Sequence, residues 1–227
     1  MLIGAFILGL FAVVGTGLVA LTYDGTAERI AENERQSLLR SLHQIIPPES
    51  HDNDIYADFI QVTDPLLGTN QPVSVYRARL GKQPVAAVIA SIAPDGYGGA
   101  IKLLVGIHYD GTLAGVRVVS HKETPGLGDA IEAERSGWIL DFTGRSLGNP
   151  EEKRWKVKKD GGVFDQFSGA TITPRAVVGA IHQVLEYVHL HHAELFAAPH
   201  TPSHEHEDDE SKDQSGSAHT PTEVTHE

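Results

Sequence analysis

The sequence predicts an α+β domain of antiparallel β-strands flanked by helices, preceded by an N-terminal membrane-spanning helix. Three observations favour this fold class. The segment Leu2–Thr22 is apolar and uncharged, short β-type runs lie between Val73 and Ser120, and an apolar stripe at helical spacing follows Arg175. The strands precede the last helix without the regular alternation that builds a parallel sheet.

The segment Leu2–Thr22 is long enough to cross a bilayer core of ~30 Å. A cleaved signal peptide usually has a shorter apolar core of roughly 7–15 residues, so an anchor is favoured. We therefore assign residues 1–23 to a transmembrane anchor. No lysine or arginine precedes the span, so charge counting does not give its orientation.

Residues 24–48 are predicted to connect the anchor to the domain. Ala27–Ile46 has apolar residues at helical spacing, and Pro47-Pro48 stops the helix. The domain is then expected over residues 49–198. Its predicted strands are Val73–Leu80, Val85–Ile92, Lys102–Tyr109 and Leu113–Ser120.

Several turns and short elements complete the prediction. Asp110-Gly111 indicates a type I′ hairpin turn, and Gly96, Gly98 and Gly99 suit a loop between strands rather than a dinucleotide fingerprint. Ser136–Phe142 is expected to form a short helix and Arg154–Lys159 a further strand. A turn at Asp160-Gly161-Gly162 follows it.

The last long helix is predicted from a stripe of apolar residues, with Pro174 at its first position and Thr173 as its N-cap. The stripe comprises Val177, Val178, Ile181, Val184, Leu185 and Val188. A capping Thr173 would leave the hydroxyl of Thr171 free. A helix start stabilises an anion, so these residues suit either a phosphate site or an ordinary capped helix after a glycine turn.

Composition excludes some classes of function. The formal net charge of -12 argues against a nucleic-acid partner, which needs a basic surface. The absence of cysteine excludes disulfides and thiolate-bound iron–sulfur clusters. Residues 199–227 are acidic and poor in bulky apolar side chains, so we expect a disordered tail.

The motifs Asp165-Gln-Phe-Ser-Gly-Ala-Thr171, His121-Lys-Glu-Thr-Pro-Gly-Leu-Gly-Asp129 and Pro94-Asp-Gly-Tyr-Gly-Gly99 together resemble one protein family. This is the FMN-binding family that comprises RnfG of the Rnf (Rsx) ion-translocating electron-transport complex and its counterpart in the sodium-pumping NADH:quinone reductase. The lead-in Trp155-Lys-Val-Lys-Lys-Asp-Gly-Gly162 is most similar to RnfG. The resemblance extends from the apolar N-terminal segment to about Phe196.

The resemblance implies a covalent flavoprotein. FMN would be joined through its phosphate to the Thr171 hydroxyl by a separate flavin transferase. Further cofactor contacts are expected from Asp165, Ser168, Gly169 and Ala170 of the flavinylation motif, and from Glu123, Thr124, Gly126, Leu127 and Gly128 of the preceding loop. No catalytic acid or base is required, because the flavin itself exchanges the electrons.

The resemblance also implies the setting. The chain would relay electrons in an Rnf-type complex that couples ferredoxin/NAD electron transfer to ion translocation. Its partners would be the other membrane and redox subunits. It would be a single-pass protein of the bacterial inner membrane with its domain on the periplasmic side. The alternatives are the FMN-binding counterpart in the sodium-pumping quinone reductase and a non-redox anchored scaffold.

Two other groups of residues have less specific patterns. The basic run Lys153–Lys159 is expected to be a solvated face, with a phosphate contact by one of its lysines as the alternative. The histidines near the C-terminus are expected to bind no metal with structural consequences; they are His189, His191, His192, His204 and His206.

Overall fold

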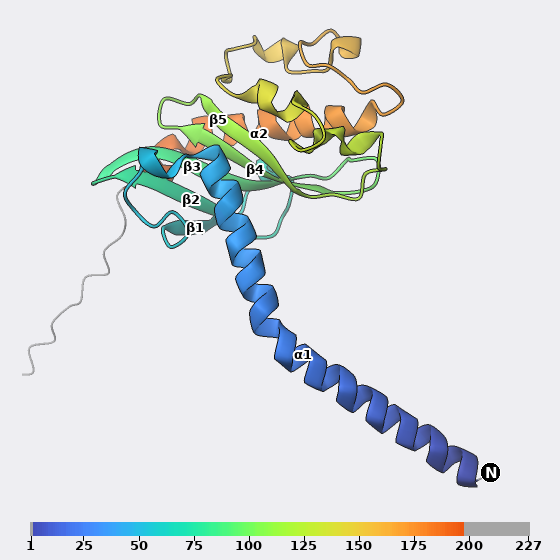
Figure 1. Ribbon diagram of the computed structural model, residues 1–227. Helices are drawn as coiled ribbons and strands as arrows, with labels where there is room; N and C mark the ends of the chain where they lie inside the picture. The colour runs from blue at the N-terminus through green and yellow to red at the C-terminus, as the bar shows by residue number, and fades with distance from the viewer. Residues whose placement is uncertain (1, 198–227) are drawn as a thin grey trace, which may run out of the picture.

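The computed structural model describes residues 2–197. Helix α1 spans Leu2–Ile45 without a break and extends well away from the domain (Figure 1). The predicted anchor and connector are therefore one helix, since no proline interrupts them. Its first part, Ile3–Ala20, is long and apolar enough to cross a membrane, and none of it is buried. The helix ends before Pro47-Pro48, as predicted.

The domain is built on a five-stranded antiparallel sheet with the strand order β1-β2-β3-β4-β5. The strands are β1 (Phe59–Val62), β2 (Val73–Leu80), β3 (Gln83–Ala93), β4 (Ile101–His108) and β5 (Leu113–Ser120). Strands β2 and β5 have the predicted bounds, and the predicted ends of β3 and β4 are within two residues of the observed ones. Strand β1 was not predicted, because four residues give too short a pattern.

The predicted hairpin joins β4 to β5. Its positive φ of 86° falls on Gly111, whose N–H donates to the His108 carbonyl at 2.9 Å. The side chain of Asp110 accepts hydrogen bonds from the N–H and the hydroxyl of Thr112, which hold the pKa of Asp110 below its usual value. The His108 N–H donates to the Thr112 carbonyl at 2.8 Å, so the loop has three residues and the predicted two-residue type I′ turn is wrong. Positive φ at the last loop residue is typical of a three-residue hairpin loop with a bulge, and the β4–β5 register shifts at Gly106/Ile107.

The two faces of the sheet are covered by different helices (Figure 1). The end of α1 packs on one face, where Leu42, Ile45 and Ile46 join Ala78, Ala86, Val88 and Leu104 in one buried cluster. Helix α2 (Ile172–Leu195) covers the opposite face. All six residues of its predicted apolar stripe are buried against alternate strand residues that include Val75, Ile89, Leu103 and Val105.

The segment between β5 and α2 contains 3₁₀ turns and loops around a group of stacked aromatic rings. The predicted short helix is a 3₁₀ turn over Trp138–Phe142. The predicted strand Arg154–Lys159 is wrong. Trp155 and Val157 are buried and Lys156 between them is exposed, but this alternation belongs to two 3₁₀ turns and one isolated bridge to Phe164.

Candidate functional site

A hollow of about 360 Å³ lies where the amino end of α2 meets the loop after β5 and the loop between β3 and β4. Three separate segments therefore line it. The lining residues are Tyr97, Glu123, Thr124, Leu127, Gly128, Gly169, Ala170, Thr171, Ile172 and Thr173. The two motifs that the sequence singled out, Glu123–Gly128 and Asp165–Thr171, thus meet in space.

The start of α2 differs from the prediction. Thr171 is the N-cap, and helical residues begin at Ile172, so Pro174 is the third helical residue rather than the first. Proline is compatible with this position because an N–H in the first turn has no intrahelical partner. Thr173 is fully buried, and its hydroxyl donates to Oε2 of Glu123 instead of capping the helix.

Thr171 is the hydroxyl residue of this segment that remains available within the hollow. Its side chain is half-buried and makes no capping hydrogen bond. The N–H groups of the first turn of α2 have no intrahelical acceptors and add a partial positive charge there. An anion next to the Thr171 hydroxyl would therefore lie at the favourable end of the helix.

The residues just before Thr171 form a supported turn. Gly169 has a φ of 78°, and the N–H of Ala170 donates to the Phe167 carbonyl at 3.2 Å. Asp165 and Ser168 do not line the hollow. Asp165 instead ties the start of this segment to neighbouring residues. Its carbonyl accepts a hydrogen bond from Nε1 of Trp138 at 2.8 Å, and its carboxylate accepts one from Nζ of Lys158 at 2.6 Å. Ser168 is exposed.

The Glu123–Gly128 loop supplies the opposite wall. Glu123 is 5 % exposed, and its two carboxylate oxygens accept hydrogen bonds from the Gly98 N–H (2.9 Å) and from Thr173. Thr124 and Leu127 face the hollow from the same loop. Gly126 lies outside the lining set and supports the loop's turn, with a φ of 78° and its N–H bonded to Asp129 Oδ1 at 2.8 Å.

Three large apolar side chains at the hollow are exposed: Tyr97 (70 %), Leu127 (46 %) and Ile172 (48 %). Apolar surface left in water next to a polar hollow is typical of a ligand site. Among the predicted site residues only Leu127 belongs to this group. Tyr97 was not predicted as a site residue. The sequence signal that could have indicated it is an aromatic residue between two glycines in the Pro94–Gly99 motif.

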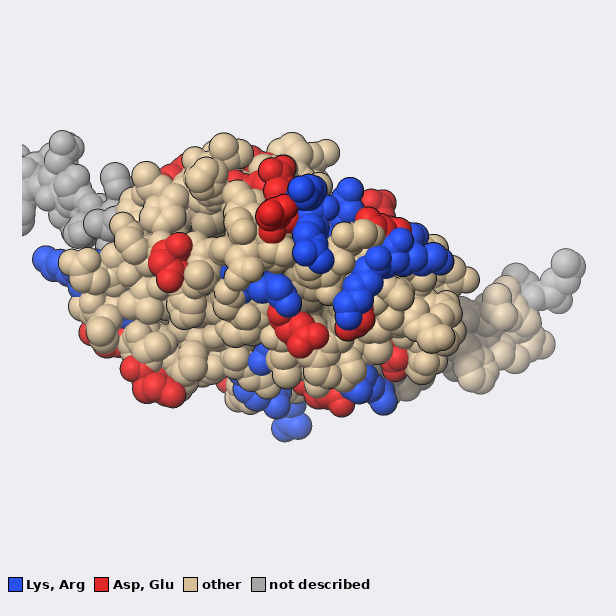
Figure 2. Space-filling model, turned by 90° about the horizontal axis from the view of Figure 1, so that it is seen from above, with Lys and Arg blue, Asp and Glu red and all other residues tan. Residues whose placement is uncertain are grey.

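Several charged side chains around the amino end of α2 and in the basic run form ion pairs. Figure 2 shows Lys and Arg gathered with Asp and Glu on the face seen from above, rather than forming a basic patch. Arg175, in the first turns of α2, donates twice to Asp160, which lowers the pKa of that carboxyl. Lys158 pairs with Asp165 and Lys153 with Glu151. The basic run is therefore mostly a solvated face.

Two family models match this chain. The family model of the FMN-binding domain matches residues 96–186, which include both walls of the hollow, and that of the RnfG N-terminal region matches residues 1–45. The ion-translocating oxidoreductase complex subunit (designated G) of Vibrio cholerae is 52 % identical over 85 % of this chain and 92 % of its own. The Pseudomonas aeruginosa protein of the same name is 51 % identical over 90 % and 96 %. The chain belongs to the RnfG family.

The predicted resemblance to RnfG is thereby confirmed, as is an α+β fold that carries an FMN-binding domain. The apolar helix and the RnfG relatives together suggest a single-pass membrane protein. The family match includes the N-terminal helix, because the matched region 1–45 covers α1.

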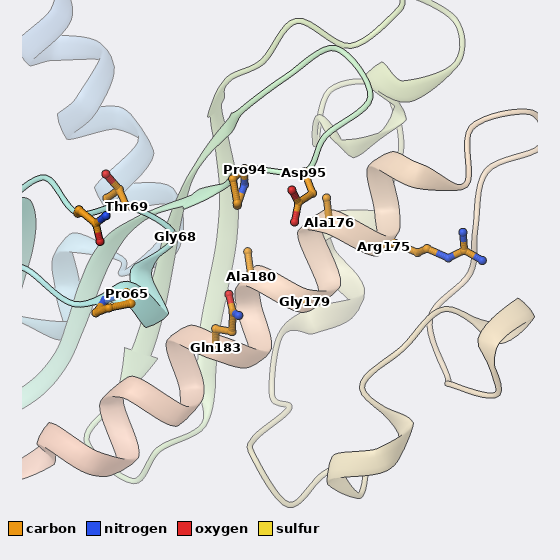
Figure 3. Close-up of a pocket in the computed structure, with 11 residues that line it drawn as sticks. Pro65, Gly68, Thr69, Pro94, Asp95, Arg175, Ala176, Gly179, Ala180 and Gln183 are labelled. Atoms are coloured by element: carbon orange, nitrogen blue, oxygen red, sulfur yellow. The ribbon is translucent and has the colours of Figure 1, made fainter.

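This member of the RnfG family has a second hollow of about 360 Å³, on another side of α2 (Figure 3). It is lined by residues that include Thr69, Asn70, Asp95, Arg175 and Gln183. In Figure 3 the Arg175 side chain points away from the other lining residues. Its guanidinium group donates two hydrogen bonds to Asp160. The hollow therefore presents polar groups without a directed cation, and it does not match a phosphate site.

The C-terminal histidines have other contacts in this fold. Nε2 of His192 lies 2.8 Å from the Tyr109 carbonyl, and His191 lies between Asp64 (3.7 Å) and Glu194 (3.5 Å). His204, His206 and the acidic tail lie outside the described residues. Within residues 2–197, the set that could hold a metal ion is Glu152, His182 and Glu186, with ligand atoms within 4.8 Å of one another. It was not predicted, because Glu152 is distant in sequence.

Proposed function

We propose that this chain is a membrane-anchored flavoprotein that carries FMN on Thr171 and relays electrons within an Rnf-type complex. The observation that carries the proposal is the free Thr171 hydroxyl at the amino end of α2, inside a hollow with an apolar rim. The FMN-binding domain match and the relatives' names support the cofactor and the complex.

The local chemistry distinguishes Thr171 from its neighbours as the attachment residue. Thr173 uses its hydroxyl in the buried bond to Glu123, and Ser168 lies outside the hollow. A phosphoester on Thr171 would place its anionic oxygens beside the first N–H groups of α2. A phosphate there needs no lysine, which is consistent with the pairing of Lys158 and Arg175 to carboxylates.

The apolar rim suits the flavin ring. Leu127 and Tyr97 come from different loops and present apolar surface at the same hollow as Thr171. Its volume of about 360 Å³ is within the range of small-molecule sites, and the exposed rim leaves part of a bound ring open to a redox partner. Bound FMN supplies the electron transfer, and the protein holds and orients it.

The proposal includes the setting of the electron relay. The anchor would place the protein in the bacterial inner membrane with its domain on the periplasmic side. A flavin transferase would attach the FMN from FAD. The complex would be a translocase that couples ferredoxin/NAD electron transfer to ion movement, and the chain alone would be an electron carrier. The partners would be its other membrane and redox subunits.

The test is to express the full chain with a flavin transferase and to examine it on a denaturing gel for flavin fluorescence. Wild-type protein is expected to retain flavin, with the added mass on the peptide that contains Thr171. Thr171→Ala should abolish the fluorescence, while Thr63→Ala, which removes an exposed threonine hydroxyl outside both motifs and outside the hollow, should retain it. Denatured Thr171→Ala protein that still carries flavin would overturn the attachment, and unlabelled wild type would support a non-redox scaffold.

A further inference from the structure

His121 links the wall of the hollow to a second layer of side chains. Its Nδ1 accepts the Glu123 N–H at 3.0 Å, and its Nε2 lies 2.6 Å from Oε1 of Glu132. A nitrogen that accepts an N–H carries no hydrogen, so the neutral ring has its proton on Nε2 and donates it to Glu132. The His121 side chain is 11 % exposed, so the ring is held between these two contacts.

Glu123, which His121 holds through its backbone, joins the three segments that line the hollow. One carboxylate oxygen binds the Gly98 N–H of the β3–β4 loop and the other binds Thr173 in the first turn of α2. Thr173 is two residues from Thr171. The orientation of the Glu123 carboxylate therefore influences the positions of two residues that line the hollow: Tyr97, which precedes Gly98, and Thr171, which precedes Thr173 by two residues.

The three segments meet at backbone contact around this carboxylate. A Cβ built on Gly98 would lie 1.9 Å from the Lys122 carbonyl oxygen. A Cβ on Gly128 would lie 2.7 Å from Oε2 of Glu123 and 2.9 Å from Oγ1 of Thr173. Because there is no spare room, a small rotation of the Glu123 backbone must move the walls of the hollow.

The second layer is itself tied to the loop. Arg135 lies 3.6 Å from Oε2 of Glu132 and 3.7 Å from Oδ2 of Asp129. Asp129 in turn accepts the Gly126 N–H at the opposite end of the same loop. The loop after β5 is thus held at Glu123 by His121 and at Gly126 by Asp129.

We propose that His121 is a positioning residue of the flavin site and acts through Glu123. Its Nδ1 orients the Glu123 backbone, the Glu123 carboxylate fixes the Gly98 loop and Thr173, and these place Thr171 and the apolar rim for the flavin. The inference rests on the proposed attachment of FMN to Thr171. It assigns to His121 no contact with the flavin.

Two variants separate the two contacts of the ring. In His121→Asn the side-chain oxygen takes the place of Nδ1 and can accept the Glu123 N–H, but the side chain is too short for Glu132. In His121→Gln the amide reaches toward Glu132, but no acceptor remains for Glu123. Both variants replace an imidazole by an amide, so each is the control for the other.

The readout is the rate at which flavin transferase labels the full chain in detergent with FAD as donor, followed by visible circular dichroism of the attached flavin. His121→Asn should be labelled at within about twofold of the wild-type rate, and His121→Gln about tenfold more slowly with an altered dichroism spectrum. Equal rates for the two variants, or a faster rate for His121→Gln, would overturn the positioning role.

A second pair tests the same inference without touching the buried ring. Glu132 is partly exposed (33 % for its side chain), so its replacement is compatible with folding. Glu132→Gln keeps an oxygen acceptor for Nε2 of His121 and should be labelled near the wild-type rate. Glu132→Ala frees the ring and should be labelled several-fold more slowly; an unchanged rate would contradict the inference. Wild-type protein unlabelled at Thr171 would instead refute the proposed function.

Discussion

Oγ1 of Thr173 donates a hydrogen bond to the carboxylate of Glu123, which lies fifty residues earlier in the chain. Both residues are buried, and in the described part of the chain no lysine or arginine is paired with this carboxylate. The bond therefore joins the Glu123–Gly128 motif to the first turn of α2, directly after the Asp165–Thr171 motif, and the Thr171 hydroxyl takes no part in it.

Thr173→Val should destabilise the protein by about 1–3 kcal/mol, because the isosteric side chain leaves the buried Glu123 carboxylate with one donor fewer. The free energy of unfolding can be measured on the full chain in detergent with urea, using the fluorescence of Trp138 and Trp155. Thr173→Ser keeps the hydroxyl and should lose less stability than Thr173→Val. A valine variant as stable as the wild type would show that this bond contributes nothing.

Gly98→Ala should destabilise the protein by about 1–3 kcal/mol and disturb the hollow, because the added methyl group would collide with the Lys122 carbonyl. The matched control is Gly137→Ala, where a Cβ has no neighbour within 4 Å and φ is -76°. Thermal unfolding of the two variants measures the difference. If both unfold at the same temperature, the close approach at Gly98 is not a constraint.

Trp138→Phe should lower the free energy of unfolding by about 1 kcal/mol, because it removes the hydrogen bond between Nε1 of Trp138 and the Asp165 carbonyl. The phenyl ring keeps most of the aromatic contact with Phe142 and Phe167. Because Asp165 begins the turn that carries Thr171, hydrogen exchange at residues 166–170 should also rise. Unchanged exchange in this segment would mean that the tryptophan does not hold the turn.

Burial raises the pKa of Tyr187 to about 12 from its usual value of 10.0. Between these values the unfolded chain releases the phenolic proton and the folded protein keeps it, so stability is full below pH 10 and falls as the pH rises toward 12. The shift corresponds to about 2–3 kcal/mol.

The check is to compare urea unfolding at pH 8 and pH 11.5 for the wild type and Tyr187→Phe. Lysines and other tyrosines titrate in both proteins, so only the difference between them reports on Tyr187. The phenylalanine variant should lose less stability at the higher pH. Parallel losses in the two proteins would contradict the assigned pKa.

Local patterns were sufficient to predict much of this fold. The bounds of β2 and β5 and the buried stripe of α2 followed from periodicity, because each element has one face on the core. The segment Arg154–Lys159 was predicted wrongly as a strand. Its alternating burial has the period of a strand, but the side chains enter a loop core of aromatic rings.

The site shows a similar division. The sequence motifs predicted Glu123, Leu127 and Thr171 as site residues, and in the structure all three line one hollow. The capping role of Thr173 was predicted wrongly, because its partner is a carboxylate on a distant loop and no local pattern reveals that partner. Tyr97 was missed as a lining residue for a related reason, since only the fold places the β3–β4 loop beside α2.

The unbroken course of α1 has a geometric consequence for the domain. A helix of 44 residues is about 66 Å long, and its carboxyl end packs on the sheet through Leu42, Ile45 and the following residue, Ile46. Removing one residue from the segment Ala31–Ser37 would rotate the hollow by about 100° about the helix axis and lower it by about 1.5 Å. Removing all seven residues of that segment would lower it by about 10 Å and nearly restore its original direction. The length of α1 thus determines both the distance of the hollow from the apolar N-terminal segment and the direction in which the hollow faces.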